Sequence, residues 1–567
     1  MASRDMTEPT TSMTPTEAQG KPPPWSRRAV ALDLALLAGL WLIAILLVNP
    51  HGNFPLIDDW IYAPTVHSIM LGLGPKLKDW GSATLVAQTY WGALFCSVFG
   101  FSFTTLRLST LVLGLAGVYG TYGLARVLGA TRFLAVVCAL ALAFNPLYFN
   151  LSFSFMTDVP FAAMAVLSIL LVVVGIQRRA GGTILLGAVG AAVATLIRQL
   201  GLVMPLAFAF STLLSRPRAR QLAVAGAFCA LATLPLVAWN WWLGHVHGVP
   251  ALYGLQAGEV MHRLAQGPAG QWHDWLLNAF VIGMYAGLFA LPVLAVKSRG
   301  AKVRDWVFLA TAPLFILGAL DQRRLMPYSY DCLGNNTIGP LFLAGRDYLI
   351  PKPLASVIIW SVLTLAAALA AASLISLLVG LVRGSLGADR RAATGARIRL
   401  FLAFCAVIYA APLVIGGFFD RYLILLAPLM AAAICAAEAR AGAGKVARWR
   451  IGAACLVLAG FATFSVAGTH DYLAWNRARW QALDHLTEVE HIRPDRIDGG
   501  FEYNGAYYLT PENLRRYPTA WVVPDDYTVS FRPLPGKQVH SVWPYSRWLP
   551  PMRDQIYVLT HTLPKSP

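Results

Sequence analysis

The stretch AVALDLALLAGLWLIAILLV, residues 29–48, decides the fold class of this chain. A helix of about 20 apolar residues crosses the roughly 30 Å hydrocarbon core of a bilayer, and in lipid a helix satisfies its own backbone hydrogen bonds. Arg27 and Arg28 precede the stretch, as they would in a signal peptide. The run is long for a signal peptide and no Ala-x-Ala cleavage site follows it, so we expect an uncleaved membrane helix.

The remainder of the chain repeats this pattern. Of its 567 residues, 57% are hydrophobic and only 13% are charged, about half the charged fraction of soluble domains. We therefore expect a polytopic α-helical membrane protein with about thirteen transmembrane helices. The apolar stretches lie near residues 29–48, 103–125, 132–149, 159–176, 182–197, 200–214, 221–243, 276–296, 305–320, 354–382, 399–417, 422–438 and 451–468.

Basic residues concentrate in every second loop between these stretches, as at Arg178 and Arg179. The positive-inside rule places the basic loops and the N-terminus in the cytoplasm. An odd number of spans then places the C-terminus outside. The formal net charge of +17 is explained by this topology, so we expect no nucleic-acid partner. The Ala-, Gly- and Arg-rich composition is typical of a GC-rich bacterium, which predicts a bacterial inner membrane with a periplasmic C-terminus.

The first external loop, residues 49–102, is long and contains a second apolar stretch at 83–100. A membrane crossing at 83–100 would invert the charge pattern of every later loop. We therefore expect residues 83–100 to form an interfacial or re-entrant helix, and residues 60–73 to form a shorter amphipathic helix. A loop of this length usually has a function.

The two ends of the chain differ from its apolar body. Residues 1–28 are rich in Thr, Pro and Ser, and we expect them to be a disordered cytoplasmic segment. Residues 29–468 form the predicted membrane domain. Residues 469–567 are predicted to form a small external α/β domain, with an amphipathic helix at 475–490 and β-strands at 520–523 and 555–559. The seven cysteines show no metal-site or disulfide spacing.

Two adjacent acids, Asp58 and Asp59, follow the first span, and Asp158 opens the fourth span on the same outer side. A carboxylate there can take a proton from a nucleophile or hold a divalent cation. A single aspartate at each place could also cap a helix. A cap needs only one of the adjacent pair, so we favour a functional role for these acids.

Basic groups interrupt the outer ends of later spans at Arg198-Gln199 and Asp420-Arg421-Tyr422. An arginine can bind phosphate with its planar fork, extend to the interface, or pair with a neighbour such as Asp420. Further external cations are Lys76, Lys78, Arg323 and Arg324. Acids and guanidinium groups around a membrane-level loop suit a substrate with a lipid tail and a phosphate that is displaced.

The sequence Asp58-Asp-Trp-Ile-Tyr62 resembles the Asp-acidic-x-x-Tyr motif of the GT-C membrane glycosyltransferases of glycosyltransferase family 39 type. These include the protein O-mannosyltransferases and the aminoarabinose transferases. The stretches 99–109, 156–160 and 421–428 are also similar to that family. The resemblance implies an inverting transfer of a sugar from a polyprenyl-phosphate donor to an envelope acceptor (a lipid, a glycan or a protein) at the outer membrane face.

The same resemblance implies roles for individual residues. Asp58 would be the catalytic carboxylate with Asp59 beside it, and Asp158 would lie near the acceptor or a metal. Arg198, Gln199, Arg421 and Tyr422 would contact the donor phosphate. Many relatives carry Lys-Pro-Pro in the first loop, where this chain reads DWGSATLVAQ at 79–88, so Lys76 or Lys78 would have to substitute. A divalent cation held by Asp58 and Asp158 is the one cofactor left open.

A transporter or lipid-linked glycan flippase is the alternative function, since it would have a similar number of helices. Transporters usually place their polar sites near the bilayer midplane between internal repeats. Here no repeat is found and the acids lie at one surface, which favours the enzyme. A non-catalytic envelope scaffold is a third reading.

Overall fold

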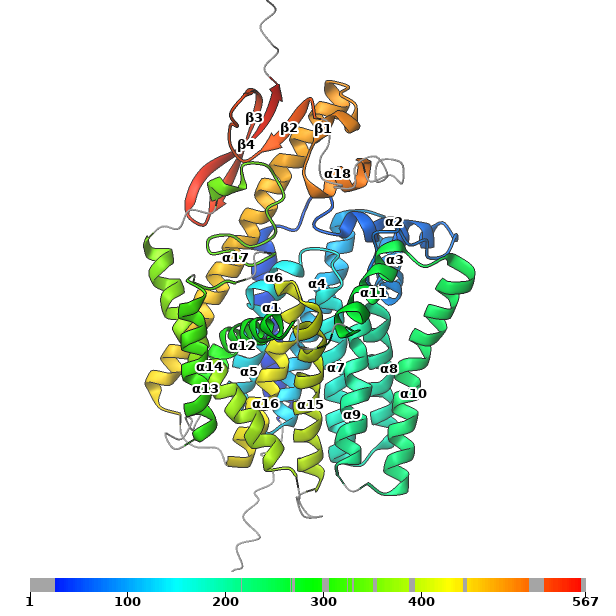
Figure 1. Ribbon diagram of the computed structural model, residues 1–567, viewed down its shortest axis with the longest axis vertical. Helices are drawn as coiled ribbons and strands as arrows, with labels where there is room; N and C mark the ends of the chain where they lie inside the picture. Colours follow the sequence, from blue (N-terminus) through cyan, green and yellow to red (C-terminus); the bar gives the residue numbers. More distant parts are fainter. Residues whose placement is uncertain are drawn as a thin grey trace, which may run out of the picture.

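The computed structural model describes residues 26–215, 217–265, 267, 271–297, 305–323, 325–328, 331–349, 354–386, 393–441, 446–508 and 525–561. These residues form a helical bundle with a small β-sheet at one end (Figure 1). We call this end of the bundle the sheet end. Of the predicted tail, residues 1–25 lie outside the described part, and the first helix begins at Arg27.

Nine helical segments in the described residues are long and apolar enough to cross a membrane, and four shorter helices are also apolar. The long ones contain α1 (Arg27–Val48), α4 (Phe103–Val127), α7 (Asp158–Arg178), α10 (Ala219–Trp242), α12 (Trp272–Ala295), α14 (Leu354–Arg383), α15 (Ala393–Gly416), α16 (Leu426–Ala441) and α17 (Arg448–Asp484). The shorter ones contain α5 (Arg132–Ala143), α8 (Gly181–Ile197), α9 (Val203–Leu213) and α13 (Trp306–Asp321). Each apolar stretch predicted from the sequence overlaps one of these helices.

The stretch 132–149 is divided between two helices. Asn145 ends α5 and caps α6 (Pro146–Leu151), because its side-chain oxygen accepts the N–H groups of Leu147 and Tyr148. Asparagine is a preferred residue at this position, and proline is favoured in the first helical turn.

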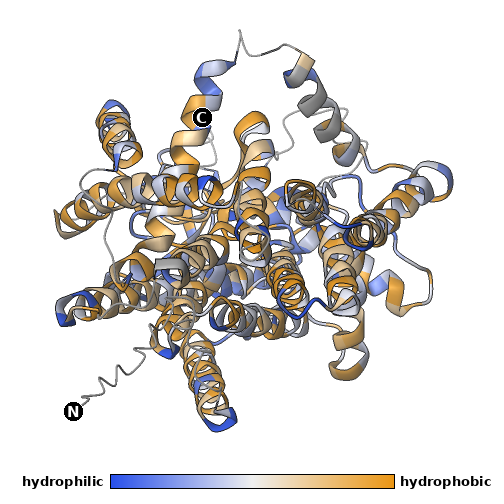
Figure 2. Cartoon of the chain, turned by 90° about the horizontal axis from the view of Figure 1, so that it is seen from below, coloured by the Kyte–Doolittle hydropathy of each residue, from blue (hydrophilic) through white to orange (hydrophobic). Residues whose placement is uncertain are grey.

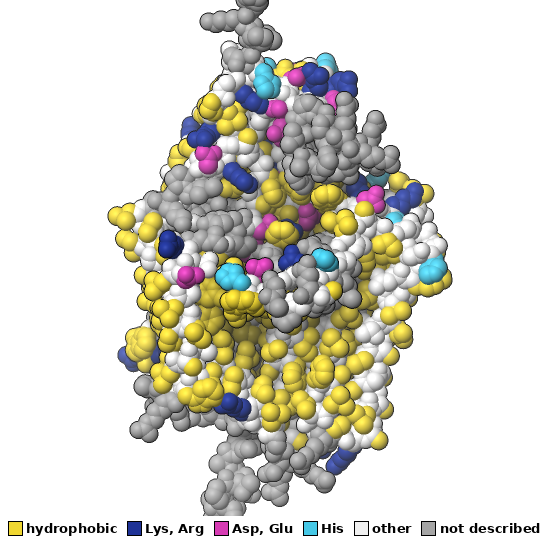
Figure 3. All heavy atoms as spheres, in the orientation of Figure 1, with side chains coloured by type: hydrophobic (Ala, Val, Ile, Leu, Met, Phe, Trp, Pro, Cys, Tyr) yellow, Lys and Arg dark blue, Asp and Glu magenta, His cyan; other side chains and the backbone are white. Residues whose placement is uncertain are grey.

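The outside of the bundle is apolar. Leu354 and Leu456 are each 75% exposed, and apolar residues run along the helices when the bundle is viewed from below (Figure 2). Contiguous apolar surface on this scale is unfavourable in water. On the face shown in Figure 3, hydrophobic side chains cover the bundle, and acidic side chains gather toward the sheet end.

Small residues let helices approach closely inside the bundle. At the contact of α4 with α7, a Cβ on Gly117 would lie 3.2 Å from the Cα of Ala163 and 2.3 Å from the hydroxyl of Tyr148. Such small-residue contacts are typical of helices that associate in lipid through van der Waals packing.

Two short helices lie at the sheet end, as predicted for the first external loop (Figure 1). They are α2 (Asp59–Met70) and α3 (Val86–Phe99). With 12 and 14 residues, they are shorter than the roughly 20 residues that a span requires. A further short helix, α11 (Ala251–Ala265), follows α10.

The C-terminal region is continuous with the last long helix. α17 has 37 residues and is followed by a π-helical turn, η6 (His485–Val489). The domain boundary predicted at residue 468 therefore lies inside α17. The helix predicted at 475–490 corresponds to the end of α17 together with η6. After it come β1 (Ile497–Asp498), α18 (Phe501–Tyr508), β2 (Tyr527–Ser530), β3 (Lys537–Trp548) and β4 (Pro551–His561).

The strands form one sheet in the order β1-β2-β4-β3. β1 pairs with β2 in parallel, and the other neighbours are antiparallel. The predicted strand at 555–559 lies within β4, and the one at 520–523 lies outside the described residues. The hairpin is attached to α17, because the Asp471 carboxylate accepts the N–H groups of Trp548 and Leu549 at 2.7 and 2.8 Å.

Candidate active site

The loop between α1 and α2 is held by two arginines from other helices. Arg107 of α4 is fully buried and donates to the carbonyls of Pro50 and Gly52, at 3.1 and 2.6 Å, and to that of Phe54. Arg477 of α17 donates to His51 O at 3.0 Å. These bonds pair backbone carbonyls of the loop, and they fix the course of the chain that leads to Asp58.

The two adjacent acids have different environments. Asp59 is completely buried, and its two oxygens accept the N–H groups of Leu56 at 3.2 Å and Phe155 at 2.8 Å. Asp58 makes no side-chain capping bond to α2, and it keeps 17% of its side chain exposed. The backbone therefore occupies Asp59, whereas the Asp58 carboxylate faces other side chains.

Asp58 belongs to a group of charged residues from five separate segments. Arg421 contacts Asp58 through Nη2 at 3.5 Å and Asp331 through Nη1 at 3.4 Å. Arg198 forms an ion pair with Asp158. We call Asp58, Asp158, Arg198, Asp331 and Arg421 the charged cluster.

Tyr422 links the two arginines of the charged cluster. Its ring lies 4.3 Å from the Arg198 guanidinium carbon and 5.7 Å from that of Arg421. Planar guanidinium groups stack favourably on aromatic faces. Tyr422 thus holds the two guanidinium groups close to each other within the charged cluster.

The local backbone explains how the side chains of the charged cluster come together. Asp158 is the first residue of α7, where a negative charge is favoured by the helix dipole. Arg198 has an extended backbone that ends α8. Arg421 lies in the short 3-10 turn η5 (Asp420–Leu423).

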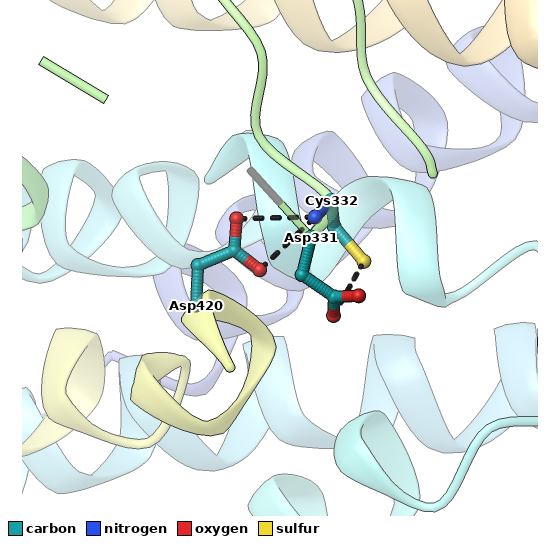
Figure 4. A group of neighbouring side chains, drawn as sticks. All are labelled: Asp331, Cys332 and Asp420. Carbon is teal, nitrogen blue, oxygen red and sulfur yellow. Dashed lines mark hydrogen bonds between the residues drawn. The ribbon is translucent and has the colours of Figure 1, made fainter. Parts of the chain in front are cut away.

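Asp420 anchors the segment that contains Asp331. Its carboxylate accepts the N–H of Cys332 at 3.1 Å (Figure 4). It also accepts the N–H of Leu333 at 2.8 Å. The pairing of Asp420 with Arg421 that the sequence allowed is therefore not the arrangement found, because Asp420 binds backbone while Arg421 reaches Asp58 and Asp331.

Burial and like charges change the acidity of the cluster. Burial raises the pKa of Asp58 to about 6, with Arg421 opposing the shift and Asp331, Asp158 and Glu502 adding to it. Burial also raises the pKa of Asp331. A carboxylate that ionises near neutral pH is well matched to general-base catalysis.

The other predicted phosphate contacts have other partners. Gln199 donates to Ser82 O at 3.2 Å, and Lys76 is exposed at the surface. Lys78 lies 5.3 Å from the Trp60 ring, and burial lowers its pKa. Of the predicted residues, the structure brings together Asp58, Asp158, Arg198, Arg421 and Tyr422. Arg323 is exposed, and Arg324 lies outside the described residues.

Asp331 was not identified from the sequence. It lies in a loop between α13 and α14 with no helical or strand pattern around it, and its role depends on contact with Arg421, 90 residues away along the chain.

The acids of this region are potential ligands for a metal ion. In the described part of the chain, one group of three potential ligands, Asp331, Cys332 and Asp420, has its ligand atoms within 4.8 Å of one another. The Asp420 oxygens accept backbone N–H groups, and Asp331 contacts Arg421. Asp58 and Asp158 each face an arginine as well. These acids are matched to positive groups of the protein and fit a cation poorly.

Residues 86–242 match the family described as dolichyl-phosphate-mannose-protein mannosyltransferase. This match confirms the resemblance to the GT-C membrane glycosyltransferases for that part of the chain. No curated protein matches the chain.

The solved structures to which this chain is similar include the following two. The oligosaccharyltransferase of Archaeoglobus fulgidus, tethered to an acceptor peptide, has a TM-score of 0.45 and 13% identity, over 87% of this chain and 59% of that one. ArnT from Cupriavidus metallidurans, bound to undecaprenyl phosphate, has a TM-score of 0.38 and 14% identity, over 94% and 97% of the two chains. This chain thus spans little more than half the length of the archaeal enzyme.

Proposed function

We propose that the protein is a membrane glycosyltransferase that moves a sugar from a polyprenyl-phosphate donor to an envelope acceptor, with Asp58 as the general base. The observation that supports this most directly is the charged cluster. It combines a carboxylate of raised pKa with two arginines oriented by one tyrosine. The family match over residues 86–242 agrees with this chemistry.

In the proposed reaction the acceptor's hydroxyl or amine attacks the anomeric carbon of the sugar. Asp58 takes the proton of the nucleophile as the new bond to carbon forms. The bond from that carbon to the phosphate oxygen breaks on the opposite side, which inverts the configuration. The electron pair leaves with the lipid phosphate, whose charge Arg198 and Arg421 stabilise.

Two buried polar atoms of the charged cluster support the placement of the substrates. Asp158 Oδ2 and Arg421 Nε have no hydrogen-bond partner among the described residues. Buried polar atoms are usually paired, so an unpaired one suggests a ligand. We assign Asp158 Oδ2 to a donor group of the acceptor and Arg421 Nε to an oxygen of the donor phosphate.

Incubation of the purified protein with a panel of polyprenyl-phosphate sugars tests this function, with donor consumption followed by mass spectrometry. We expect Asp58→Asn to slow transfer about 10²- to 10⁴-fold, the usual contribution of a general base. Asp79→Asn is the matched control, because Asp79 is an exposed acid of the same loop. Normal turnover by Asp58→Asn would exclude Asp58 as the base.

We also propose that the sheet end faces the periplasm and the N-terminus the cytoplasm. The basic loops predicted to be cytoplasmic, such as Arg178-Arg179 at the end of α7, support this orientation. Labelling of single cysteines introduced at Asp79 and at Arg179, with a membrane-impermeant reagent on intact cells, tests it. Labelling at Arg179 but not at Asp79 would reverse the orientation.

A further inference from the structure

The residue before Asp58 has a strained backbone. Ile57 has a φ of +55°, a region that β-branched residues rarely adopt. Such a conformation costs of order 1–3 kcal/mol, and it persists only where the surroundings hold it in place. The direction in which the Asp58 carboxylate points therefore depends on whatever holds Ile57.

Ile57 is held by the C-terminal region. Its N–H donates to Glu502 Oε1 at 3.0 Å, and the other oxygen of Glu502 accepts Arg479 Nη1 at 2.7 Å. Both side chains of this ion pair are 0% exposed. A fully buried ion pair adds little to stability, because the cost of removing two charges from water offsets their attraction. A role beyond stability is thus worth seeking for this pair.

The helix that contains Glu502 is packed directly on the helix that follows Asp58. The rings of Phe501 in α18 and Trp60 in α2 meet edge to face at 6.1 Å. A Cβ on Gly505 would lie only 2.4 Å from the Trp60 ring, so the two helices have no room to shift toward each other. Arg479 is fixed in turn, because its Nε donates to Gly499 O at 2.8 Å.

We propose that Glu502 is a positioning residue for Asp58: together with Arg479, it locks the backbone of Ile57 so that the Asp58 carboxylate faces Arg421. This inference rests on the proposed function, in which Asp58 is the base. It makes the C-terminal region a working part of the active site, although Glu502 and Asp58 are 444 residues apart in the sequence.

The charged groups around Asp58 predict a second measurable effect of Glu502, on the pKa of Asp58. Asp58 is influenced by Arg421 from η5, Asp331 from the loop before α14, Asp158 from α7 and Glu502 from α18, and Asp59 and Tyr62 lie on its own helix. Arg421 lowers the pKa of Asp58, whereas the three acids raise it. Neutralising Glu502 should therefore lower the pKa of Asp58 as well as loosen its position.

The test uses Glu502→Gln in the full-length protein. Glutamine keeps an oxygen for the Ile57 N–H but loses the ion pair, so we expect kcat to fall about 10- to 100-fold, as misplacement of a catalytic group does. The KM for the donor should stay within about twofold, because both phosphate-binding arginines remain. The acid limb of the pH profile should move to lower pH.

The matched control is Asp554→Asn, which removes another buried charge pair of the C-terminal region, Arg547–Asp554 at 3.4 Å. It lies in the β3–β4 hairpin, and we expect its kcat to be unchanged. If Glu502→Gln fails to fold, Glu502→Gln combined with Arg479→Met removes the unpaired charge and is assayed in its place.

Amide hydrogen exchange of residues 54–62 measures the positioning without any substrate. We expect faster exchange there in Glu502→Gln and no change in Asp554→Asn. Wild-type kcat and unchanged exchange in Glu502→Gln would overturn the positioning role. Inactivity of the natural protein on every donor would count against the proposed function, while the exchange measurement would still decide the role of Glu502.

Discussion

We expect the Asp331→Asn variant to remain active at lower pH than the natural protein. Asp58 must be ionised to accept a proton, so the rate should fall about tenfold for each pH unit below its pKa. That pKa is raised to about 6. The natural protein should therefore lose activity as the pH falls through about 6.

The size of the expected shift in the acid limb follows from Arg421, which contacts both Asp58 and Asp331. Asp58 and Asp331 contact the two ends of the Arg421 guanidinium at 3.5 and 3.4 Å. The guanidinium lies between the two carboxylates, and like charges roughly 8 Å apart repel by ~2 kcal/mol at an effective dielectric constant of about 20. One pKa unit corresponds to about 1.4 kcal/mol, so removing Asp331 should move the acid limb down by about 1.5 pH units. In this variant Arg421 pairs with Asp58 alone, and this also lowers the pKa of Asp58.

Donor consumption by the purified variant, measured between about pH 4.5 and pH 8, gives the position of the acid limb. Asp347→Asn serves as the control, because Asp347 belongs to the same loop but pairs with Arg532 at an exposed site. An active Asp331→Asn variant whose acid limb stays in place, or moves up, would refute the electrostatic coupling.

Three other changes test the site. Arg198→Lys keeps the charge but loses the planar fork that pairs with Asp158 and stacks on Tyr422, so the KM for the donor should rise about tenfold in steady-state kinetics; an unchanged KM would place the phosphate elsewhere. Asp59→Asn replaces an acceptor of two backbone N–H groups and should lower the stability by about 1–3 kcal/mol, seen as a lower Tm, whereas an unaltered Tm with lost turnover would point to a chemical role. Chelation of divalent cations should leave turnover unchanged, because each acid of the charged cluster faces an arginine; activity lost with a chelator and restored by Mg²⁺ or Mn²⁺ would contradict this.

The membrane helices could be predicted because length and hydropathy are enough to define a span. Asp58, Asp158, Arg198 and Arg421 could be found for a related reason. Charged groups at the ends of apolar helices are costly, so each stands out in the sequence, although nothing in the sequence measures the distances between them.

Other features depend on contacts that no local pattern reveals. The structural role of Asp59 comes from the N–H of Phe155, 96 residues away, and two adjacent aspartates look alike until that partner is known. Asp331 and Glu502 lie in segments without strong periodicity, and only the fold brings them to Arg421 and Ile57. The continuation of α17 beyond residue 468 could not be predicted, because the composition changes from apolar to polar there although the helix does not end.

That helix also limits how the protein can be divided. With 37 residues and a rise of 1.5 Å per residue, α17 is about 55 Å long, almost twice the roughly 30 Å apolar core of a bilayer. A junction chosen where the composition changes would cut a continuous rod and separate Arg479 from the membrane part. The C-terminal region is therefore not an exchangeable module, and a chimera between relatives should be joined before Arg448, so that the rod and the sheet are inherited together.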